Sequence, residues 1–399
     1  MKFAHLADCH IGSWRDPKLN NAATEAFIKA IDLCIKHETD FIIIAGDLFN
    51  TSLPNIDHLK QVTKTLKTLK DKNIPVYLVA GSHDFSASGK TMLDVLENAG
   101  LITNVAKGEE ENNQLNLKFT IDPKTNTKIT GMLGKKGMLE KTYYESLNKT
   151  PLEEEQGYKI FVFHSLLSEF KPADMEKIEA QPLSLLPKNF NYYAGGHPHF
   201  VFQKQESGYG LITYPGPLFP NNFKELETLK RGGFYIVTDN QPEHIPIQLY
   251  NVHPIKINAD NKTTEQIENE IKQNIEKQEF NNTIVTIRVK GTLNSGKISD
   301  INFKDIFQIL YNKSAYFVLK NTSNLKTKEF DEIKIHADSV DEIEDKLIKE
   351  HLGQQKISLD EEDLTKQLMK TLETEKKDGE TVATFEKRIR EETKDILRC

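Results

Sequence analysis

Five short clusters of metal-binding side chains occur in the first half of the sequence, each directly after a run of apolar residues. The clusters are Asp8-Cys9-His10, Gly46-Asp47, Gly81-Ser82-His83-Asp84, His164, and Gly195-Gly196-His197-Pro198-His199. Short apolar runs are typical of buried strands, and ligand sites of α/β sheets lie beyond the carboxyl ends of the strands. We therefore expect the five clusters to meet at one edge of a sheet.

Carboxylate and imidazole ligands without thiolate suit divalent cations such as Mn²⁺, Fe²⁺ or Zn²⁺. Two such ions about 3.5–4 Å apart can share a carboxylate and activate a water for attack on phosphorus. One cluster alone is a weak signal, because a single histidine after a strand is more often a structural residue. Five clusters at strand ends, which together hold five of the twelve histidines, favour a metal site.

The spacing within two clusters is also informative. Asp8 and His10 lie two residues apart, so in an extended chain both side chains point the same way and Cys9 points into the core. His197 and His199 repeat this spacing. The other histidines lack such a context and are expected to be structural: His5, His37, His58, His244, His253, His336 and His351.

The elements that would position these clusters alternate between strands and helices. In the first 100 residues, strands are predicted at 2–7, 41–45 and 75–80, and helices at 20–36, 56–69 and 91–98. This alternation predicts a parallel sheet that is buried on both faces. Further strands are predicted at 158–163, 191–194, 210–214 and 233–238, and we expect a second sheet made from them to stack on the first.

The α/β pattern restarts after residue 252, with strands at 254–257, 283–290 and 316–320 and helices at 264–276 and 303–310. Near the C-terminus, apolar residues recur at helical spacing on both sides of a turn at 376–379. So short a helix pair cannot bury both apolar stripes against itself. It would dock either on the body of this chain or on a partner subunit.

Composition narrows the class of protein. A chain of 399 residues has room for two or three domains. The formal net charge of −7 gives no global attraction to nucleic acid, so binding of a polyanion would depend on local basic patches or bound cations. Three cysteines are too few for a disulfide framework. With no signal peptide and no long apolar run, we expect a cytoplasmic protein without a membrane span.

The motifs Asp-x-His (8–10), Gly-Asp-Leu-Phe (46–49), Gly-Ser-His-Asp (81–84), His164 and Gly-His-Pro-His (196–199) resemble those of the calcineurin-like metallophosphoesterases. Their order, together with Tyr-Pro-Gly (214–216) and Gly-Gly-Phe-Tyr (232–235), is similar to the SbcD-type nuclease subunit of the DNA double-strand-break repair complex. The resemblance covers nearly the whole chain. It implies a four-layer α-β-β-α sandwich with a small α/β cap domain and C-terminal helices.

The domains that follow from this resemblance have definite bounds. They are a metallophosphoesterase (nuclease) domain at 1–250, an α/β cap that binds DNA at 251–335, a helical linker at 336–358, and a C-terminal helix-loop-helix at 359–399.

The resemblance also implies two Mn²⁺-type ions. Asp8, His10 and His199 would hold one ion, and Ser82, His164 and His197 would surround the other, with Asp47 bridging the two. His83 would not bind metal but would protonate or stabilise the leaving oxygen. Asp84 would orient a neighbouring histidine.

Two positions depart from the family pattern. The family usually has asparagine at the position of Ser82, and often serine at the position of Pro217. A hydroxyl is shorter than an amide and would reach a metal only through water, so the second ion should bind more weakly. Ser82 is either an engineered change with this consequence or a natural variant in which water fills the gap. Pro217 alters a loop on the substrate side.

The resemblance implies Mn²⁺-dependent 3′–5′ exonuclease and single-strand endonuclease activity on DNA, in a nucleoid-associated protein. It implies a homodimer, with helices 59–69 and 91–98 as candidates for the interface. A coiled-coil ABC-type ATPase would bind the C-terminal helices in a helix-in-groove mode. The anchors would be Leu364, Leu368, Leu372, Phe385 and Ile389.

Basic groups near the predicted site are either phosphate contacts or solvated loop charges. The candidates are the pairs Trp14-Arg15, Lys135-Lys136 and Lys230-Arg231, in which Trp14 is an aromatic neighbour of the basic Arg15. Two other functions remain open on the same core. One is a small-molecule phosphodiesterase. The other is a DNA-end-binding subunit with low catalytic activity because of Ser82.

Overall fold

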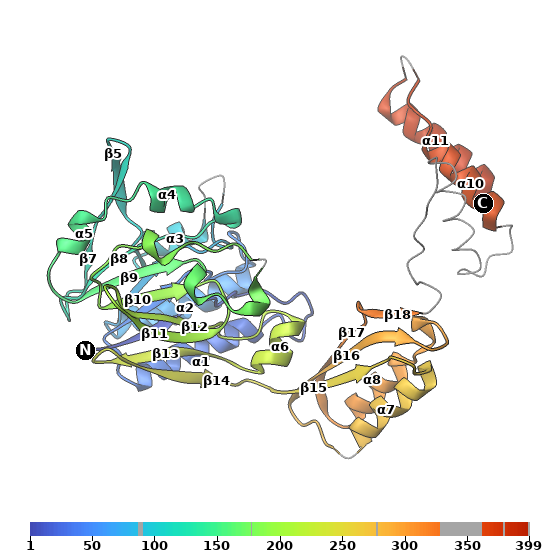
Figure 1. Cartoon of the computed structure of the whole chain (residues 1–399), viewed down its shortest axis with the longest axis horizontal. Coiled ribbons are helices and arrows are strands. Elements are labelled where there is room, and N and C mark those ends of the chain that lie inside the picture. Colours follow the sequence, from blue (N-terminus) through green and yellow to red (C-terminus); the bar gives the residue numbers. More distant parts are fainter. Residues whose placement is uncertain (87–90, 177, 277, 328–360, 378–379, 398–399) are drawn as a thin grey trace. The chain divides into compact units, whose positions relative to one another are not determined.

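The computed structural model describes residues 1–86, 91–176, 178–276, 278–327, 361–377 and 380–397. The chain divides into two compact units, Met1–Lys328 and Glu329–Cys399. Figure 1 shows the order of the elements from the N-terminus (blue) to the C-terminus (red).

The first sheet has the strand order β14-β13-β1-β2-β3-β4, and its strands from β1 to β4 run parallel. These four strands are β1 (Lys2–Leu6), β2 (Phe41–Ala45), β3 (Val76–Val79) and β4 (Thr103–Asn104). The helices between them are α1 (Ala22–Lys36), α2 (Ile56–Asp71) and α3 (Met92–Asn98). The predicted strand–helix alternation is confirmed, with element ends shifted by one or two residues.

Both faces of this sheet are buried because alternate residues of each strand pack on different layers. Ile42 and Ile44 of β2 join the hydrophobic cluster formed with α1 and α2. Phe41 and Ile43 point the other way, into the cluster between the two sheets. A strand with two buried faces needs apolar residues throughout, which explains the uninterrupted sequence Phe-Ile-Ile-Ile-Ala.

The second sheet has the order β11-β12-β10-β9-β8-β7. Its strands are β7 (Thr120–Ile121), β8 (Lys128–Met132), β9 (Lys159–His164), β10 (Tyr192–Gly196), β11 (Val201–Glu206) and β12 (Gly210–Pro215). Ile160, Val162 and Tyr192 pack against the first sheet. The outer layer is thin and includes the short helices α4 (Lys141–Glu145) and α5 (Thr150–Glu154). The predicted four-layer architecture is therefore confirmed, with unequal outer layers. A two-stranded hairpin of β5 (Gly108–Glu111) and β6 (Gln114–Leu117) lies apart from both sheets.

One strand belongs to a different sheet from the one we expected. β13 (Gly232–Thr238) pairs antiparallel with β1, and β14 (Gln241–Ile247) follows it at the edge of the first sheet. The expectation that residues 233–238 extend the second sheet is therefore wrong. A strand that is buried on both faces, such as β13, is apolar throughout in either sheet. Its sequence therefore does not show which sheet it joins.

The cap is a parallel sheet of β15 (Asn251–Asn258), β16 (Thr283–Leu293), β17 (Ala315–Asn321) and β18 (Leu325–Thr327). Helices α7 (Thr264–Glu276) and α8 (Phe303–Asn312) bury one face of it. On the other face, Ile284 and Phe317 join the hydrophobic cluster of the first sheet and its helices. The cap thus has a core of its own and is also packed on the first sheet and its helices.

The second unit contains α10 (Glu361–Leu372) and α11 (Val382–Leu397), which contact each other. None of the described residues of these two helices is buried. The predicted helical linker at 336–358 lies outside the described residues. Among the described helices of both units, none has the length and apolarity that a membrane span requires.

Candidate metal centre

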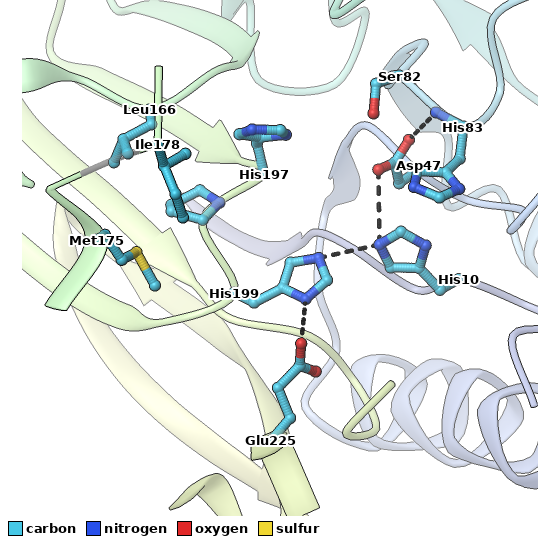
Figure 2. A pocket seen from close by; sticks show the side chains of 11 residues that line it. His10, Asp47, Ser82, His83, Leu166, Met175, Ile178, His197, His199 and Glu225 are labelled. Atoms are coloured by element: carbon cyan, nitrogen blue, oxygen red, sulfur yellow. Dashed lines mark hydrogen bonds and ion pairs between the residues drawn. The ribbon is translucent and has the colours of Figure 1, made fainter. Parts of the chain in front are cut away.

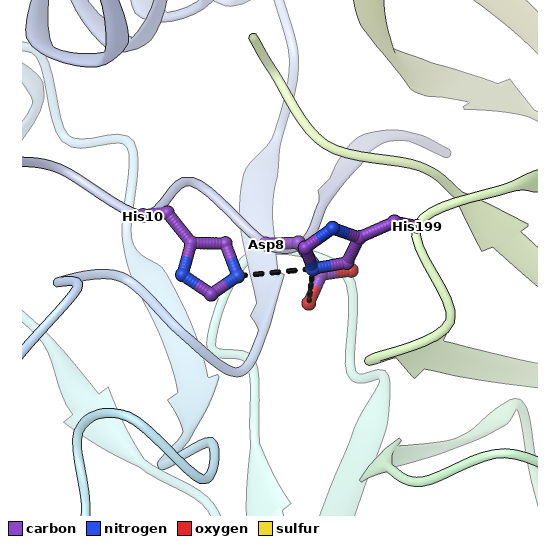
Figure 3. A group of neighbouring side chains, drawn as sticks. All are labelled: Asp8, His10 and His199. Atoms are coloured by element: carbon purple, nitrogen blue, oxygen red, sulfur yellow. Dashed lines mark hydrogen bonds and ion pairs between the residues drawn. The ribbon is translucent and has the colours of Figure 1, made fainter. Parts of the chain in front are cut away.

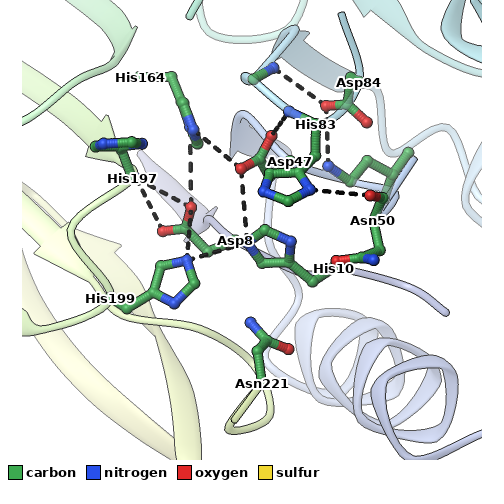
Figure 4. Close-up of polar contacts among 12 residues, drawn as sticks. Asp8, His10, Asp47, Asn50, His83, Asp84, His164, His197, His199 and Asn221 are labelled. Carbon is green, nitrogen blue, oxygen red and sulfur yellow. Dashed lines mark hydrogen bonds and ion pairs between the residues drawn. The ribbon is translucent and has the colours of Figure 1, made fainter. Parts of the chain in front are cut away.

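The five clusters predicted from the sequence come together at one edge of the stacked sheets (Figure 4). Asp8 and His10 follow β1, and Asp47 follows β2. His164 ends β9, while His197 and His199 follow β10 in the other sheet. Ligands from both sheets thus face one another, because the carboxyl ends of β1, β2, β9 and β10 lie on the same side of the sandwich.

The first group contains Asp8, His10 and His199 (Figure 3). The two Nε2 atoms of His10 and His199 lie 3.0 Å apart, and Nε2 of His199 lies 3.7 Å from Oδ1 of Asp8. Two nitrogen ligands of one cation, each at about 2.1 Å and at a right angle, are about 3.0 Å apart. This group has the residue types and the spacing of three ligands of one ion, and it is the set expected for the first metal.

The second group contains Asp8, Asp47 and His164. Nδ1 of His164 donates a hydrogen bond to the carbonyl of Ala45 at 2.9 Å, which leaves the lone pair of Nε2 free. That Nε2 lies 3.1 Å from Oδ2 of Asp47. It is buried and makes no hydrogen bond with the part of the chain that the structure describes. A buried lone pair without a donor is what a metal ligand requires.

Asp47, a member of the second group, also lies close to His10 of the first group. Its Oδ2 is 3.1 Å from His164 and 3.5 Å from His10, and its Oδ1 accepts the backbone N–H of His83 at 2.7 Å. One carboxylate oxygen is thus shared by histidines from opposite sheets. This is the position that a bridging ligand would occupy.

The remaining two expected ligands are less closely placed. Ser82 and His197 line the same cavity of about 390 Å³ as His10, Asp47 and His199 (Figure 2). The ring of His197 is 5.2 Å from that of His164, and its backbone N–H donates to both oxygens of Asp8. His197 belongs to neither of the close groups described above. The second metal position is therefore less complete than the first.

His83 faces the cavity from the first sheet. Its Nδ1 donates to the carbonyl of Asn50 at 2.9 Å, so Nε2 is the ring nitrogen that can gain or lose a proton. Its ring stands edge-on to that of His10, with centroids 4.8 Å apart. His83 also forms a close group with His10 and Asp47. Its ring is held by Asn50 and its hydrogen bond to Asp47 comes from the backbone N–H, a position that suits proton transfer at the edge of the site.

Asp84 has a role different from the one we expected. Its carboxylate accepts the backbone N–H groups of Leu48, Phe49 and Gly81 at 3.1, 2.9 and 3.1 Å. It therefore does not orient a histidine directly. It holds the loop after Asp47 against the loop that begins at Gly81, and so positions the carboxylate of Asp47 through the backbone.

Replacing Asp84 by asparagine should destabilise this loop pair. The side-chain NH₂ of asparagine would replace one of the two accepting oxygens and would face a backbone N–H. Two donors then meet, and a buried unpaired donor costs about 1–3 kcal/mol. We expect a loss of about 2 kcal/mol, seen as a lower midpoint of thermal unfolding of the metal-free protein. Asp94→Asn at the exposed N-terminal cap of α3 serves as the control. A midpoint as high as that of the wild type would contradict this role.

The backbone at the site adopts a conformation that side chains rarely allow. The φ angles are 50° at Asp8, 42° at His10, 51° at Asp47, 97° at His197 and 48° at His199. Left-handed residues other than glycine are uncommon and cluster at functional sites. This finding corrects the extended-chain explanation for Asp8 and His10. Both side chains reach the site from residues with positive φ, whose backbone N–H groups bond to the carbonyls of Gly46 and Asp47, while Cys9 is buried in the core as expected.

Two glycines leave space that any side chain would fill. A Cβ atom at Gly46, where φ is 82°, would lie 2.1 Å from Nδ1 of His164. A Cβ atom at Gly81 would lie 2.2 Å from Oδ1 of Asp47. The sequence therefore needs glycine at these strand ends so that the ligands can approach the backbone.

Charges within the site affect one another strongly. Burial raises the pKa of Asp8, despite the nearby His199 and His164. Burial opposes ionisation of Asp47 too, but His164 and His10 hold its pKa well below the usual range. Burial disfavours a charged His164, yet Asp47 and Asp8 raise its pKa to about 10. A bound cation would replace the proton that these carboxylates attract to His164.

The candidate DNA contacts differ in their surroundings. Trp14 donates from Nε1 to the carbonyl of Pro220 at 2.9 Å and packs on the core, so its visible role is structural. Lys135 donates to the hydroxyl of Tyr143 at 2.7 Å and lies over that ring. The other four are exposed at the surface: Arg15, Lys136, Lys230 and Arg231.

The histidines outside the clusters have structural partners where the structure describes them. Nδ1 of the buried His5 is 3.0 Å from the hydroxyl of Tyr192, and Nε2 of His58 is 2.9 Å from Oδ1 of Asn20. His336 and His351 lie outside the described residues.

Two polar residues at the site were not singled out from the sequence. Glu225 accepts a hydrogen bond from Nδ1 of His199 at 3.0 Å. Asn221 lies beside the site (Figure 4), and its side-chain oxygen and nitrogen are buried with no hydrogen-bond partner in the described chain. Both belong to a polar stretch around a short helix, and no motif marks them. Their importance comes from tertiary contacts alone.

Comparison with known proteins agrees with this geometry. The chain is similar to the DNA double-strand break repair protein Mre11 of Archaeoglobus fulgidus, with 29% identity over 64% of this chain and 61% of that protein. Mre11 of Methanococcus maripaludis is 32% identical over 59% of this chain and 62% of that protein. Mre11 of Sulfolobus acidocaldarius is 25% identical over 82% of this chain and 86% of that protein. The chain thus covers less than two thirds of the first two relatives. The predicted resemblance to repair nucleases of this type is confirmed as a similarity.

Structural comparison adds a weaker likeness, to a dimetal phosphatase from Danio rerio. The identity is 11% and the TM-score 0.41, over 62% of this chain and 98% of that one, which is too low to bear on function. The calcineurin-like phosphoesterase family model matches residues 1–200, half of the chain. This chain belongs to the calcineurin-like phosphoesterase family.

Proposed function

We propose that this protein is a Mn²⁺-dependent nuclease that hydrolyses phosphodiester bonds at DNA ends in double-strand-break repair. It would act as a 3′–5′ exonuclease and a single-strand endonuclease. The observation that carries the proposal is the position of Asp47, whose one oxygen lies within 3.5 Å of histidines from both sheets. Similarity to the archaeal Mre11 proteins supports DNA as the substrate.

Each residue has a part in the proposed reaction. Asp8, His10 and His199 would hold one ion, Asp47 would bridge, and Ser82, His164 and His197 would surround the other. The bound ions would activate the attacking water and neutralise the phosphate. His83 would deliver a proton from Nε2 to the leaving oxygen, since Asn50 fixes the proton on Nδ1. The cations also explain how a chain with a net charge of −7 could handle a polyanion.

The proposal is tested with labelled DNA oligonucleotides and bis(p-nitrophenyl) phosphate, each with Mn²⁺ and with chelator. Stepwise shortening from 3′ ends and cutting of single strands, both lost with chelator, are expected. Activity confined to the small diester would instead favour the phosphodiesterase alternative. Tight binding of DNA ends without cleavage would favour the end-binding alternative.

Replacing Ser82 by asparagine tests the weakest part of the site. Asparagine offers an amide oxygen farther from the backbone, so the second ion should bind more tightly. We expect DNA cleavage at limiting Mn²⁺ to rise more than about tenfold, or roughly 1.4 kcal/mol of barrier. The exposed Ser323→Asn in the cap is the matched control. An unchanged rate would show that Ser82 is already competent.

Homodimerisation is proposed around α2 and α3. Ile56 and Leu53 at the start of α2 and Val95 on α3 expose 78%, 67% and 54% of their surface. The backbone N–H of Met92 bonds to the carbonyl of Ser52 at 3.2 Å, which brings these segments together. Exposed large apolar residues in proximity favour an interface.

Ile56→Glu should therefore convert dimer to monomer in light scattering coupled to size exclusion. Ile121→Glu, at an exposed isoleucine of the second sheet, should leave the mass unchanged. A monomeric wild type would contradict the proposed dimer.

We also propose that a coiled-coil ABC-type ATPase binds α10 and α11. The five expected anchors are half-buried or exposed, and Leu372 exposes 66% of its surface. Such stripes remain available to a partner. The cap is proposed to bind DNA, and the protein to act in the cytoplasm near the nucleoid.

A further inference from the structure

The short helix α6 (Phe223–Leu229) carries two carboxylates that contact different parts of the molecule. Glu225 contacts the metal ligand His199, and Glu227 contacts Arg288 of the cap. We propose that α6 couples the cap to the metal ion held by Asp8, His10 and His199, with Glu225 as a positioning residue for His199. This inference rests on the proposed metal centre.

Glu225 fixes the orientation of the His199 ring. Its Oε1 accepts the Nδ1–H of His199 at 3.0 Å, and its Oε2 accepts the backbone N–H of Asn221 at 2.8 Å. Asn222 caps the helix by accepting the backbone N–H of Glu225 at 2.9 Å. With Nδ1 protonated, the lone pair of Nε2 points toward His10 (Figure 2). Carboxylates that hold metal-binding histidines in this way strengthen metal binding.

Glu227 anchors the same helix to the cap. Nε of Arg288 on β16 donates to Oε1 and Oε2 of Glu227 at 3.1 and 2.9 Å, and a terminal nitrogen lies 2.8 Å from Oε2. The Glu227 side chain is only 4% exposed, so the carboxylate depends on this pairing. The guanidinium also lies 4.9 Å from the ring centre of Phe223, at the start of α6. A planar, bidentate pair of this kind fixes the helix in one position.

A second line of contacts leads from the cap to the segment that follows His10. The hydroxyl of Tyr316 on β17 donates to the carbonyl of Lys18 at 2.7 Å, and the Lys18 amine lies over the ring of Tyr311. Residues 11–20 directly follow His10. Trp14 in this segment donates to Pro220, which directly precedes the α6 region.

The first line of contacts ends on His199, and the second ends on the segment that follows His10. His164, by contrast, ends β9 in the middle of the second sheet, between β8 and β10. A shift of the cap should alter the ion at Asp8, His10 and His199 before it alters the ion at His164. Binding of DNA by the cap would then act on one ion selectively.

The experiment measures Mn²⁺ binding to the full-length protein by calorimetry, and the relative occupancy of the two positions by anomalous diffraction at limiting Mn²⁺. Glu225→Gln removes the carboxylate. Glu227→Met/Arg288→Met replaces the ion pair by apolar groups of similar size, which leaves neither a buried charge nor a buried polar group unpaired. Lys272→Ala, which breaks an ion pair with Asp305 inside the cap, is the control.

Glu225→Gln should weaken binding at His10 and His199 about tenfold, in the range seen for residues that support metal ligands. The Glu227/Arg288 pair variant should weaken the same position about threefold, and Lys272→Ala should match the wild type. Combining Glu225→Gln with the pair variant should give less than the product of the separate effects, because both act through α6.

Three results would overturn the coupling. They are unchanged Mn²⁺ affinity in the pair variant, equal weakening at the His164 position, or fully multiplicative effects in the combined variant. Unchanged affinity in Glu225→Gln would overturn the positioning role. If the wild type bound no Mn²⁺, the metal centre and the proposed function would fail together, whereas failure of the variants alone leaves that function intact.

Discussion

Replacing Asp47 by alanine is expected to remove binding of both Mn²⁺ ions and to abolish DNA cleavage. Its Oδ2 lies 3.1 Å from His164 and 3.5 Å from His10, so this one carboxylate oxygen lies between histidines of the two proposed ion positions. Loss of the shared ligand should lower the rate more than about a thousandfold, or roughly 4 kcal/mol of activation free energy.

Calorimetric titration with Mn²⁺ and an assay on labelled DNA check this expectation together. The matched control is Asp122→Asn, at a buried carboxylate that bonds to the hydroxyl of Tyr77 outside the site. That variant should lose stability but retain metal. If Asp47→Ala still bound two ions, the bridging role would be wrong.

Replacing His83 by glutamine is expected to stop DNA cleavage while both ions stay bound. The ring of His83 bonds to the carbonyl of Asn50, and its hydrogen bond to Asp47 comes from the backbone N–H. General acid catalysis contributes about 10²–10⁴-fold, most of all for a poor leaving group such as a deoxyribose oxygen.

The choice of substrate makes this prediction specific. Cleavage of DNA should fall about 10²–10⁴-fold, whereas an activated p-nitrophenyl diester, whose leaving group needs no proton, should be affected far less. His37→Gln, at the C-terminal end of α1, is the control. An equal loss on both substrates would argue against proton delivery, and loss of Mn²⁺ would make His83 a ligand.

Much of this architecture could be predicted because its signals are local. A fully apolar run such as Phe41–Ala45 identifies a buried strand, and the glycine and aspartate that follow it mark the strand end. Helix α7 (Thr264–Glu276) has the predicted bounds, since Ile267, Ile271 and Ile275 recur every four residues. Topology then brings strand ends together, which is why the ligand clusters could be found.

The features that the sequence did not predict depend on contacts between distant segments. Which sheet β13 joins depends on its pairing with β1, and an apolar strand carries no mark of its partner. Asp84 stands next to His83 in sequence, yet its partners are backbone groups of residues 48, 49 and 81. Glu225 gains its role only because α6 lies against the loop of His199.

The left-handed backbone at the site favours function at the expense of the free energy of unfolding. The residues concerned are Asp8, His10, Asp47, His197 and His199. Each such residue costs on the order of 1 kcal/mol that glycine would relieve. A laboratory selection for heat resistance alone, carried out without metal, should therefore accumulate glycine at these five positions. The selected variants would have the highest unfolding temperature and the weakest binding of a cation. The natural residues at these five positions are therefore explained by their chemistry and not by their effect on stability.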